Sequence, residues 1–403
     1  MQEQQSYDVL ICGSGLVGLA MALALVPTRL RIALLDPHVV PSAPEDGMEQ
    51  PGFDARVSAL TPASRALFEA LGVWGRIEAL RVCPYTDMQV WDADGTGSIH
   101  FSAAELHQPC LGYIAENSLV AGVLADAARA SAQIEILQGS LDTFVAQPHG
   151  QLVTLGDGTQ LSCKLLLGAD GGNSRVRALA NIAAKEWDTG HHALVTTVLT
   201  EQPHRYTAWQ RFMPTGPLAF LPLYLPGAAL QRHSSIVWSC VPELADELLA
   251  LDAAPFMRRL ETAFERRLGA VESIASRHAF PLWQKHAEHY VQSGLALIGD
   301  AAHTIHPLAG QGVNLGLADV KSLAGVVLRA VQRGEDFASE QVLSRYQRER
   351  KAANLGMLLV MEGFKRAFGS QNLQVRWLRN VGLKAADSMR PFKQAVMKGA
   401  MGL

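Results

Sequence analysis

The sequence predicts an α/β fold in which a helix-covered parallel sheet is joined to a second domain made of β-strands. Three observations predict it. A buried strand, a glycine-rich turn and an apolar helix open the chain at residues 9–25. Two further strands, near 165–168 and 295–300, run into aspartate-containing turns and then into helices. Between them, residues 184–285 contain short apolar segments separated by Gly and Pro turns, which is typical of antiparallel strands.

Size and composition agree with this class. The chain has 403 residues, 48% hydrophobic and 18% charged, which allows two or three globular domains. A net charge of −3 does not favour nucleic acid as a partner. The five cysteines are scattered and odd in number, and the N-terminus lacks the basic region of a signal peptide, so we expect reduced thiols in a cytoplasmic protein.

The first element is a strand–turn–helix unit with the glycine pattern of dinucleotide-binding folds. The strand at 9–12 is followed by Gly13-Ser14-Gly15-Leu16-Val17-Gly18, and a second strand ends at Asp36. Gly13 would permit the tight turn, Gly15 would let the backbone approach a pyrophosphate, and Gly18 would let the helix pack on the strand. Asp36 could accept hydrogen bonds from a ribose. The pattern leaves NAD and FAD open, although its position at the N-terminus favours FAD; the alternative is an ordinary βαβ turn.

Two later segments repeat the scheme of a strand that ends in a polar turn. The strand at 165–168 continues into Ala169-Asp170-Gly171-Gly172 and a helix with two arginines. The strand "LALIGD" ends at Asp300, and a helix begins at Gly310-Gln311-Gly312.

Together the three motifs, GxGxxG, GADGxxS and GDAAHxxxPxxGQGxN, resemble those of the flavin-dependent aromatic hydroxylases with the p-hydroxybenzoate hydroxylase fold. Phrases such as "RVSALTPASRALFEALGVW", "GPLAFLPL" and "AMGL" are similar to the ubiquinone-biosynthesis hydroxylases, which act on polyprenylated phenols, and the likeness covers essentially the whole chain. It implies a Rossmann-like FAD domain, a β-sheet substrate domain and a helical C-terminal tail. The implied reaction is C5 hydroxylation of 2-polyprenylphenol. Hydroxylation at C6 or C1, a soluble small-phenol hydroxylase and a non-catalytic flavin-binding scaffold subunit are the alternatives.

The resemblance also implies site residues. Asp36 would bind the adenosine ribose, Arg56 the ribityl-phosphate region and Asp300 the ribityl chain. The segment 310–314 would place amides, at a helix N-terminus, against the flavin ring that becomes anionic on reduction. Asp170 would serve both FAD and the nicotinamide. NADPH or NADH is expected as a transient reductant, because the sequence shows one dinucleotide fold. The full set of expected FAD-binding residues is Gly13, Gly15, Gly18, Asp36, Arg56, Asp170, Asp300, Gly310, Gln311, Gly312, Val313 and Asn314.

One departure concerns the helix after residue 115. Many relatives place an arginine there, whereas this chain has Glu116 and Asn117. A flavin contact from that helix is therefore in doubt.

Two histidines, His303 and His306, stand three residues apart and would share a face if they were helical. No third ligand stands nearby, so we expect no metal. We expect His303 to orient the turn after Asp300, and we identify His306 and Pro307 as candidates for a contact in the active site. A hydrogen-bonded structural histidine is the alternative for His306.

The predicted FAD domain is discontinuous, comprising 1–85, 104–183 and 286–362, and the sheet domain comprises 86–103 and 184–285. Phe220 and Leu221 are candidates to line the substrate pocket, with ordinary core packing as the alternative. The remaining segment, 363–403, contains eight Lys or Arg residues and one acid with interleaved apolar residues. It predicts contact with an anionic membrane surface or an acidic partner, unless it is the solvated basic face of a packing helix. The resemblance implies other ubiquinone-biosynthesis proteins as partners and peripheral contact with the inner membrane.

Overall fold

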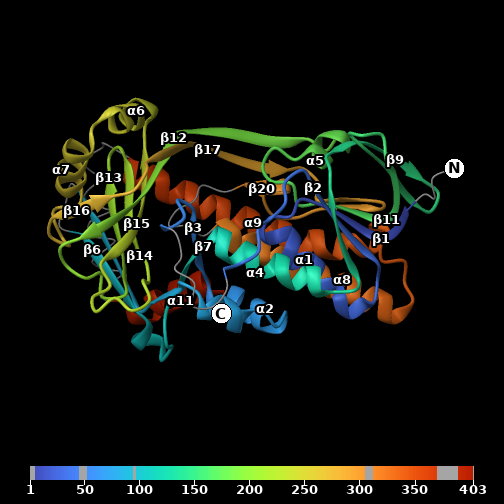
Figure 1. Cartoon of the computed structure of the whole chain (residues 1–403), viewed down its shortest axis with the longest axis horizontal. Helices are drawn as coiled ribbons and strands as arrows, with labels where there is room; N and C mark the ends of the chain where they lie inside the picture. The colour runs from blue at the N-terminus through green and yellow to red at the C-terminus, as the bar shows by residue number, and fades with distance from the viewer. Residues whose placement is uncertain (1–4, 45–51, 94–96, 305–311, 370–388, 403) are drawn as a thin grey trace.

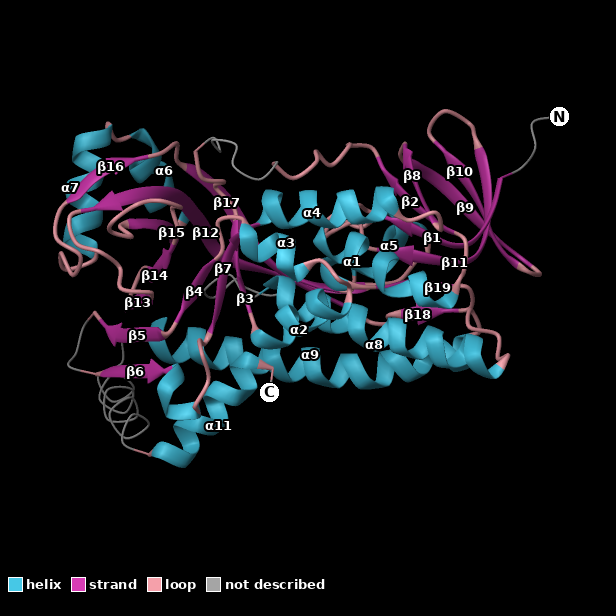
Figure 2. Ribbon diagram, turned by 60° about the horizontal axis from the view of Figure 1, so that its bottom comes forward, coloured by secondary structure: helices cyan, strands magenta, loops and turns pink. Residues whose placement is uncertain are grey.

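Two large sheets form the two ends of the molecule, and the long strands β12 and β17 run between the ends (Figure 1). The computed structural model describes residues 5–44, 52–93, 97–304, 312–369 and 389–402. Within this part the predicted α/β class is confirmed. Short strands form a third sheet between the two, and most of the long helices cover the first sheet (Figure 2).

The first sheet has eight described strands in the order β18-β19-β11-β1-β2-β8, with β10 and β9 continuing from β11. The pairs β19–β11, β11–β1, β1–β2 and β2–β8 are parallel, so these strands all point the same way. Val9, Leu10 and Ile11 are fully buried, as expected for a central strand of a parallel sheet that is covered on both faces. The bounds are β1 Gln5–Cys12, β2 Ile32–Asp36, β8 Ile134–Gln138, β9 Leu141–Gln147, β10 Gly150–Leu155, β11 Gln160–Gly168, β18 Val291–Gln292 and β19 Leu295–Leu297.

Helices cover this sheet because their sequences are apolar on the inward side. The helix α1 packs against both α8 and α4, and α9 packs on α8. Their joint core contains Leu19, Leu124, Leu323 and Tyr346, each fully buried. The bounds are α1 Leu16–Leu25, η1 Val26–Thr28, α4 Asn117–Ala130, α5 Arg175–Leu179, η3 Gly299–Ala301, α8 Gly312–Arg333 and α9 Glu340–Gly369.

The second sheet has nine described strands in the order β20-β17-β12-β15-β14-β13-β5-β6, with β16 paired to β12. Only β13 and β5 pair in parallel among these strands. The hairpin β5–β6 joins this sheet through the pairing of β5 with β13. The bounds are β5 Asp87–Asp92, β6 Ser98–Ser102, β12 Ala184–Thr200, β13 Thr207–Met213, β14 Gly216–Pro222, β15 His233–Cys240, β16 Val271–Ile274, β17 His278–Ala287 and β20 His303–Thr304.

Two helices in this region were not predicted. The helices α6 (Pro242–Ala250) and α7 (Ala253–Ala263) pack on one face of the second sheet, where Phe256, Leu260 and Phe264 enter its core. The remaining elements are β3 Val57–Leu60, β4 Cys83–Tyr85 and β7 Gly112–Glu116, which form the third sheet, and α2 Pro62–Ala70, α3 Trp74–Ala79, η2 Ala103–Leu106 and α11 Arg390–Met401.

One predicted domain boundary coincides with the start of a strand, and two others fall inside an element. The strand β12 begins at Ala184, where the second part of the sheet domain was expected to begin, whereas β17 continues across 285/286. The boundary at 362/363 falls inside α9. The five cysteines are unpaired and buried, which agrees with the expected reduced thiols.

The end of the second sheet holds a buried histidine, His204, whose imidazole has one defined tautomer. Its Nε2 donates to the carbonyl of Leu223 at 3.0 Å, and its Nδ1 accepts from the amide of Tyr206 at 3.0 Å. Burial lowers the pKa of His204 to about 4, although the Leu223 carbonyl acts in the opposite direction. A proton on Nδ1 would face an N–H donor, so the fold requires the neutral ring.

Candidate functional site

The glycine turn after β1 is tightly packed on one side and open on the other. Gly13 has a φ of +107°, and a Cβ there would lie 2.3 Å from the carbonyl oxygen of Ala169. A Cβ at Gly18 would lie 1.9 Å from the carbonyl oxygen of Gly13. Gly15 is the N-cap of α1, and no atom lies within 4 Å of its Cβ position. An open helix N-terminus of this kind can receive an anionic group.

Asp36 stands beside this turn at the end of β2. Its Oδ2 accepts a hydrogen bond from the amide of Ser14 at 2.7 Å, and its Oδ1 accepts one from the amide of His38 at 2.9 Å. These two amides fix the carboxylate next to the glycine turn. A hydroxyl-bearing ligand at the turn would find the carboxylate already oriented.

Asp170 follows β11 and contacts the start of α5. Its Oδ2 accepts from the amides of Arg175 at 2.7 Å and Val176 at 3.0 Å, while its Oδ1 is buried without a hydrogen-bond partner in the described residues. Arg177 donates to the carbonyls of Ala301 at 2.8 Å and Gly172 at 2.9 Å. Sequence reasoning noticed this arginine but gave it no role; it ties the second motif to the third.

Asp300 lies in η3, after β19 has ended at Leu297. Its side chain is exposed, and its carboxylate makes no hydrogen bond to the part of the chain that the structure describes. The surrounding protein nevertheless raises the pKa of Asp300 by desolvation, while His303 and Arg56 act to lower it. The carboxylate is therefore accessible from outside, and the positive charge of Arg56 acts on it.

The start of α8 is held by a side chain rather than only by its backbone. The Oδ1 of Asn314 accepts from the amide of Thr61 at 3.0 Å and from the hydroxyl of Ser64 at 2.7 Å, and its Nδ2 donates to the carbonyl of Ala59 at 2.7 Å. These contacts fix the helix N-terminus against β3 and α2. Gly312 has open space at its Cβ position, and Val313 packs partly against the core. His306, Pro307, Gly310 and Gln311 lie outside the described residues.

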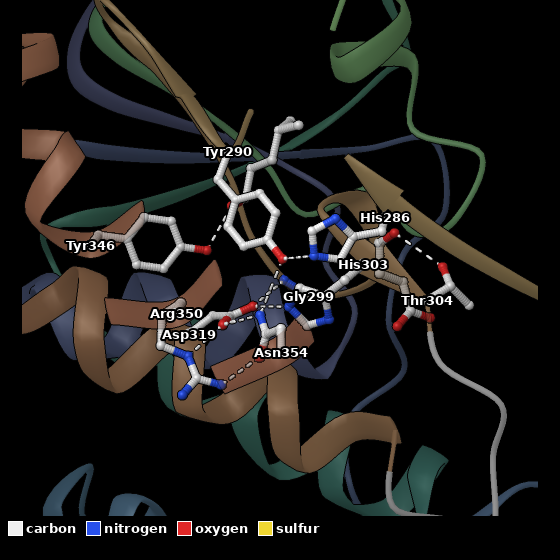
Figure 3. A network of polar contacts seen from close by, with 11 residues as sticks. His286, Tyr290, Gly299, His303, Thr304, Asp319, Tyr346, Arg350 and Asn354 are labelled. Carbon is white, nitrogen blue, oxygen red and sulfur yellow. Dashed lines mark hydrogen bonds and ion pairs between the residues drawn. The ribbon is translucent and has the colours of Figure 1, made fainter. Parts of the chain in front are cut away.

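His303 lies in strand β20, where it pairs with His286, so the helical spacing of His303 and His306 does not apply to it. Its Nε2 lies 2.5 Å from Oδ2 of the buried Asp319 (Figure 3). In the described part of the chain, no three His, Cys, Asp or Glu side chains are placed to hold a metal ion.

Four neighbouring strands bring these features to one edge. The order β19-β11-β1-β2 is parallel throughout, and the strands are followed by Asp300, Asp170, Gly13 and Asp36 in turn, the last at the end of β2 itself. Ligands of open α/β sheets bind at the carboxyl ends of the strands. An open helix N-terminus, two amide-held carboxylates and one free carboxylate on this edge fit an extended dinucleotide.

Comparison with known proteins identifies the dinucleotide. Residues 6–358 match a family model described as an FAD binding domain. The chain is 39% identical over 400 residues to the 3-demethoxyubiquinol 3-hydroxylase of Escherichia coli (strain K12), covering 99% of both chains. It is 35% identical to the ubiquinone hydroxylase UbiL of Rhodospirillum rubrum (98% and 89% covered) and to the mitochondrial ubiquinone biosynthesis monooxygenase COQ6 of Xenopus tropicalis (97% and 92%).

The chain belongs to the family of FAD-dependent ubiquinone hydroxylases. The fold of this hydroxylase is that of p-nitrophenol 4-monooxygenase PnpA from Pseudomonas putida, with a TM-score of 0.78, 19% identity and 99% of both chains covered. Klebsiella pneumoniae HpxO in complex with FAD gives a TM-score of 0.72 at 18% identity, with 98% of both chains covered. The predicted p-hydroxybenzoate hydroxylase-type fold and the FAD cofactor are thereby confirmed.

The departure at Glu116 and Asn117 has a structural explanation in this hydroxylase. Glu116 is buried, forms an ion pair of 2.9 Å with Arg81, and accepts from the amide of Asp54 at 2.6 Å. Burial raises the pKa of Glu116, against the effects of the Asp54 amide and Arg81. The amide of Asn117 donates to the carbonyl of Arg56. The two residues support the loop that carries Arg56, a role that sequence reasoning missed.

On the substrate side, Phe220 follows the alternative of ordinary core packing. Its ring stacks on Phe264 after α7, with centroids 3.6 Å apart, in the core between the second sheet and its helices. Leu221 faces the other way and is buried against Ala59 and the third sheet. The side chains of the second sheet that pack against Ala55, next to the Arg56 loop, are Ala193, Val195 and Leu282.

A cavity of about 530 Å³ lies elsewhere, between α2, α8, α9 and α11. Asn314, Lys321 and Arg350 are among its lining residues. Because it is not at the strand edge that carries the three aspartates, we do not assign it to the cofactor. None of the described helices is long and apolar enough to cross a membrane.

Proposed function

We propose that this FAD-dependent monooxygenase hydroxylates the ring of a polyprenylated phenol or quinol in ubiquinone biosynthesis, with O₂ and NADPH or NADH as co-substrates. The observation that carries the proposal is the 39% identity to a 3-demethoxyubiquinol 3-hydroxylase across 99% of both chains. A likeness over the whole length includes the second sheet, which in this fold lies on the substrate side. Fold alone would not support a substrate.

The residues of the strand edge would divide the work of binding FAD. The N-terminus of α1, at Gly15, would receive the pyrophosphate, and Asp36 the adenosine ribose. Asp300 and Arg56 would hold the ribityl region, and the N-terminus of α8, from Gly312, the flavin ring. Bound FAD supplies the oxygen chemistry, while the protein positions the ring to be hydroxylated and excludes water. The reductant would bind transiently, because one dinucleotide fold is present among the described residues.

Two ring positions are candidates. Motif phrases favour C5 of 2-polyprenylphenol, whereas the name of the Escherichia coli relative favours the later hydroxylation of 3-demethoxyubiquinol. Profiling quinone intermediates in a strain that lacks this chain would separate them, because the unmodified precursor accumulates. Accumulation of 2-polyprenylphenol would support C5 and accumulation of the demethoxy compound the later step. Unchanged ubiquinone would contradict the proposal.

The same strain separates the rival functions. Complementation with Asp300→Ala should fail if the chain is an enzyme and succeed if it is a non-catalytic scaffold subunit. With purified protein, a prenylated phenol should stimulate NAD(P)H oxidation and be recovered as the hydroxylated product. Stimulation only by a simple hydroxybenzoate would instead indicate a small-phenol hydroxylase.

The substrate class sets the location of the reaction. Each buried CH₂ is worth about 0.8 kcal/mol, so a polyprenyl chain stays in a bilayer or with a carrier protein. We propose a cytoplasmic protein that meets its substrate at the inner-membrane surface or in a complex with other ubiquinone-biosynthesis proteins. The basic C-terminal segment is the candidate contact surface.

A further inference from the structure

A fully buried carboxylate joins two of the segments that face the cofactor. Asp319 lies on α8 and is 0% exposed. Its Oδ2 accepts a hydrogen bond from the amide of Gly299 at 3.0 Å and lies 2.5 Å from Nε2 of His303. Gly299 and His303 stand on either side of Asp300, so one oxygen holds both ends of the Asp300 turn (Figure 3).

The rest of that turn is also fixed by hydrogen bonds. Arg177 donates to the carbonyl of Ala301, and the hydroxyl of Thr304 donates to the carbonyl of Asp300 at 3.2 Å. The backbone of the turn is thereby held from α5, α8 and β20. The carboxylate of Asp300 makes no hydrogen bond to the described residues, which leaves it available to a ligand.

Arg350, on α9, balances the negative charge of Asp319. Its Oδ1 lies 2.8 Å from Nε of Arg350 and 3.4 Å from Nδ2 of Asn354. Burial alone would raise the pKa of Asp319, but His303 and Arg350 outweigh it, so the pKa lies below its ordinary value. The buried hydroxyl of Tyr290 lies 3.4 Å from Nδ2 of Asn354 and closes the network (Figure 3). A buried charge is tolerable only with such partners.

We propose that Asp319 is a positioning residue for FAD, acting through Asp300 and without touching the cofactor. It sits two turns after the N-terminus of α8, the helix that faces the flavin ring, and it holds the turn that presents Asp300 to the ribityl chain. It therefore sets the spacing between these two segments. Its loss should weaken FAD binding more than it lowers the stability of the fold.

The first test compares Asp319→Asn with Tyr346→Phe in the purified apoprotein and holoprotein. Tyr346 is a matched control, because it is fully buried on α9 and its described hydrogen bond goes to the carbonyl of Leu297, at 2.8 Å, rather than to Asp319. We expect FAD to bind Asp319→Asn roughly ten- to hundred-fold more weakly, since charge-assisted hydrogen bonds are lost. The rise in melting temperature on adding FAD should shrink, and the visible circular dichroism of bound flavin should change.

For Tyr346→Phe we expect lower melting temperatures with and without FAD, an unchanged difference between them and a wild-type flavin spectrum. If Asp319→Asn behaves in this same way, the residue stabilises the core and the proposal is overturned.

A second pair of variants covers the case in which Asp319→Asn does not fold. His303→Gln keeps an N–H donor at the position of Nε2, whereas His303→Leu removes it. We expect His303→Gln to retain FAD affinity to within about threefold together with the wild-type flavin spectrum, and His303→Leu to bind FAD more weakly and to change the spectrum. Equal behaviour of the two variants would refute the positioning role. These readouts need no substrate, so they stand whichever ring is hydroxylated.

Discussion

Lys393 decides what part of the C-terminal segment can serve as a basic surface. It lies on α11 but is only 5% exposed, and its Nζ is 2.7 Å from Oε1 of Glu105. Gln394 donates to the carbonyl of Glu105, and Met397 and Met401 are buried beside Leu111. Lys393 is one of the eight cations of residues 363–403, but it is not part of an exposed basic surface, because it holds α11 against η2.

Reversing this charge should undock α11. Breaking a buried ion pair costs about 3–5 kcal/mol, but Glu105 is a third exposed, so we expect about 2–4 kcal/mol for Lys393→Glu. Lys398→Glu is the control, since Lys398 is exposed and should change stability by less than about 0.5 kcal/mol. Hydrogen exchange over residues 389–402 measures the docking, and Glu105→Lys should rescue Lys393→Glu. Equal protection in the two single variants would refute the reasoning.

A test of membrane contact should therefore use cations of the segment other than Lys393. Arg376, Arg379 and Lys384 lie outside the described residues and remain the candidates for anionic lipid, at about 1 kcal/mol each before screening. Replacing these three by Glu should lower flotation with anionic liposomes and turnover of a long-chain substrate, and leave FAD content and turnover of a short-chain analogue unchanged. If Lys393 were replaced as well, a loss of liposome binding could not be distinguished from the effect of undocking α11.

Three further outcomes are expected. Asp300→Ala should weaken FAD binding by roughly 1–3 kcal/mol or more and His303→Ala by less, as measured by flavin fluorescence titration, and an unchanged dissociation constant for Asp300→Ala would exclude its role. Gly15→Val should keep the melting temperature of the apoprotein but lose FAD, because its Cβ enters open space, whereas Gly18→Ala should destabilise the apoprotein itself. The free energy of unfolding should fall by about 3 kcal/mol as pH drops from 6.5 to 4, because the unfolded chain binds a proton on His204 that the folded protein does not. Urea unfolding of His204→Gln should lack this component; the same pH slope in that variant would assign it to other groups.

The features that the sequence predicted are those set by local backbone geometry. Gly13 is required by the tight turn and by its contact with Ala169, and Gly18 by its contact with Gly13. Asp170 and Asp300 each follow a strand directly in the sequence, which indicates that they lie at the carboxyl edge of the sheet. The helix α7 could have been predicted too, because Phe256, Leu260 and Phe264 recur at four-residue spacing.

The features that the sequence did not predict depend on contacts between distant segments. Asn314 bonds to Thr61 and Ala59, more than 250 residues away, and Lys393 bonds to Glu105 from the other end of the chain. The direction of Phe220 follows from which face of the second sheet α7 covers. In the sequence alone, a buried carboxylate such as Asp319 cannot be distinguished from an exposed polar residue on a helix.

The three carboxylates of the strand edge differ in how many of their oxygens already accept hydrogen bonds from the protein. Asp36 accepts two backbone amides, and one oxygen of Asp170 accepts two more, so each stabilises its own turn whether or not FAD is present. Asp300 has no such bond in the described residues, and its turn is braced by Asp319 and Arg177 instead. Its oxygens can therefore accept hydrogen bonds from a hydroxyl-bearing ligand, and its own turn does not depend on them. This makes Asp300 the carboxylate whose removal should be felt most in binding and least in folding.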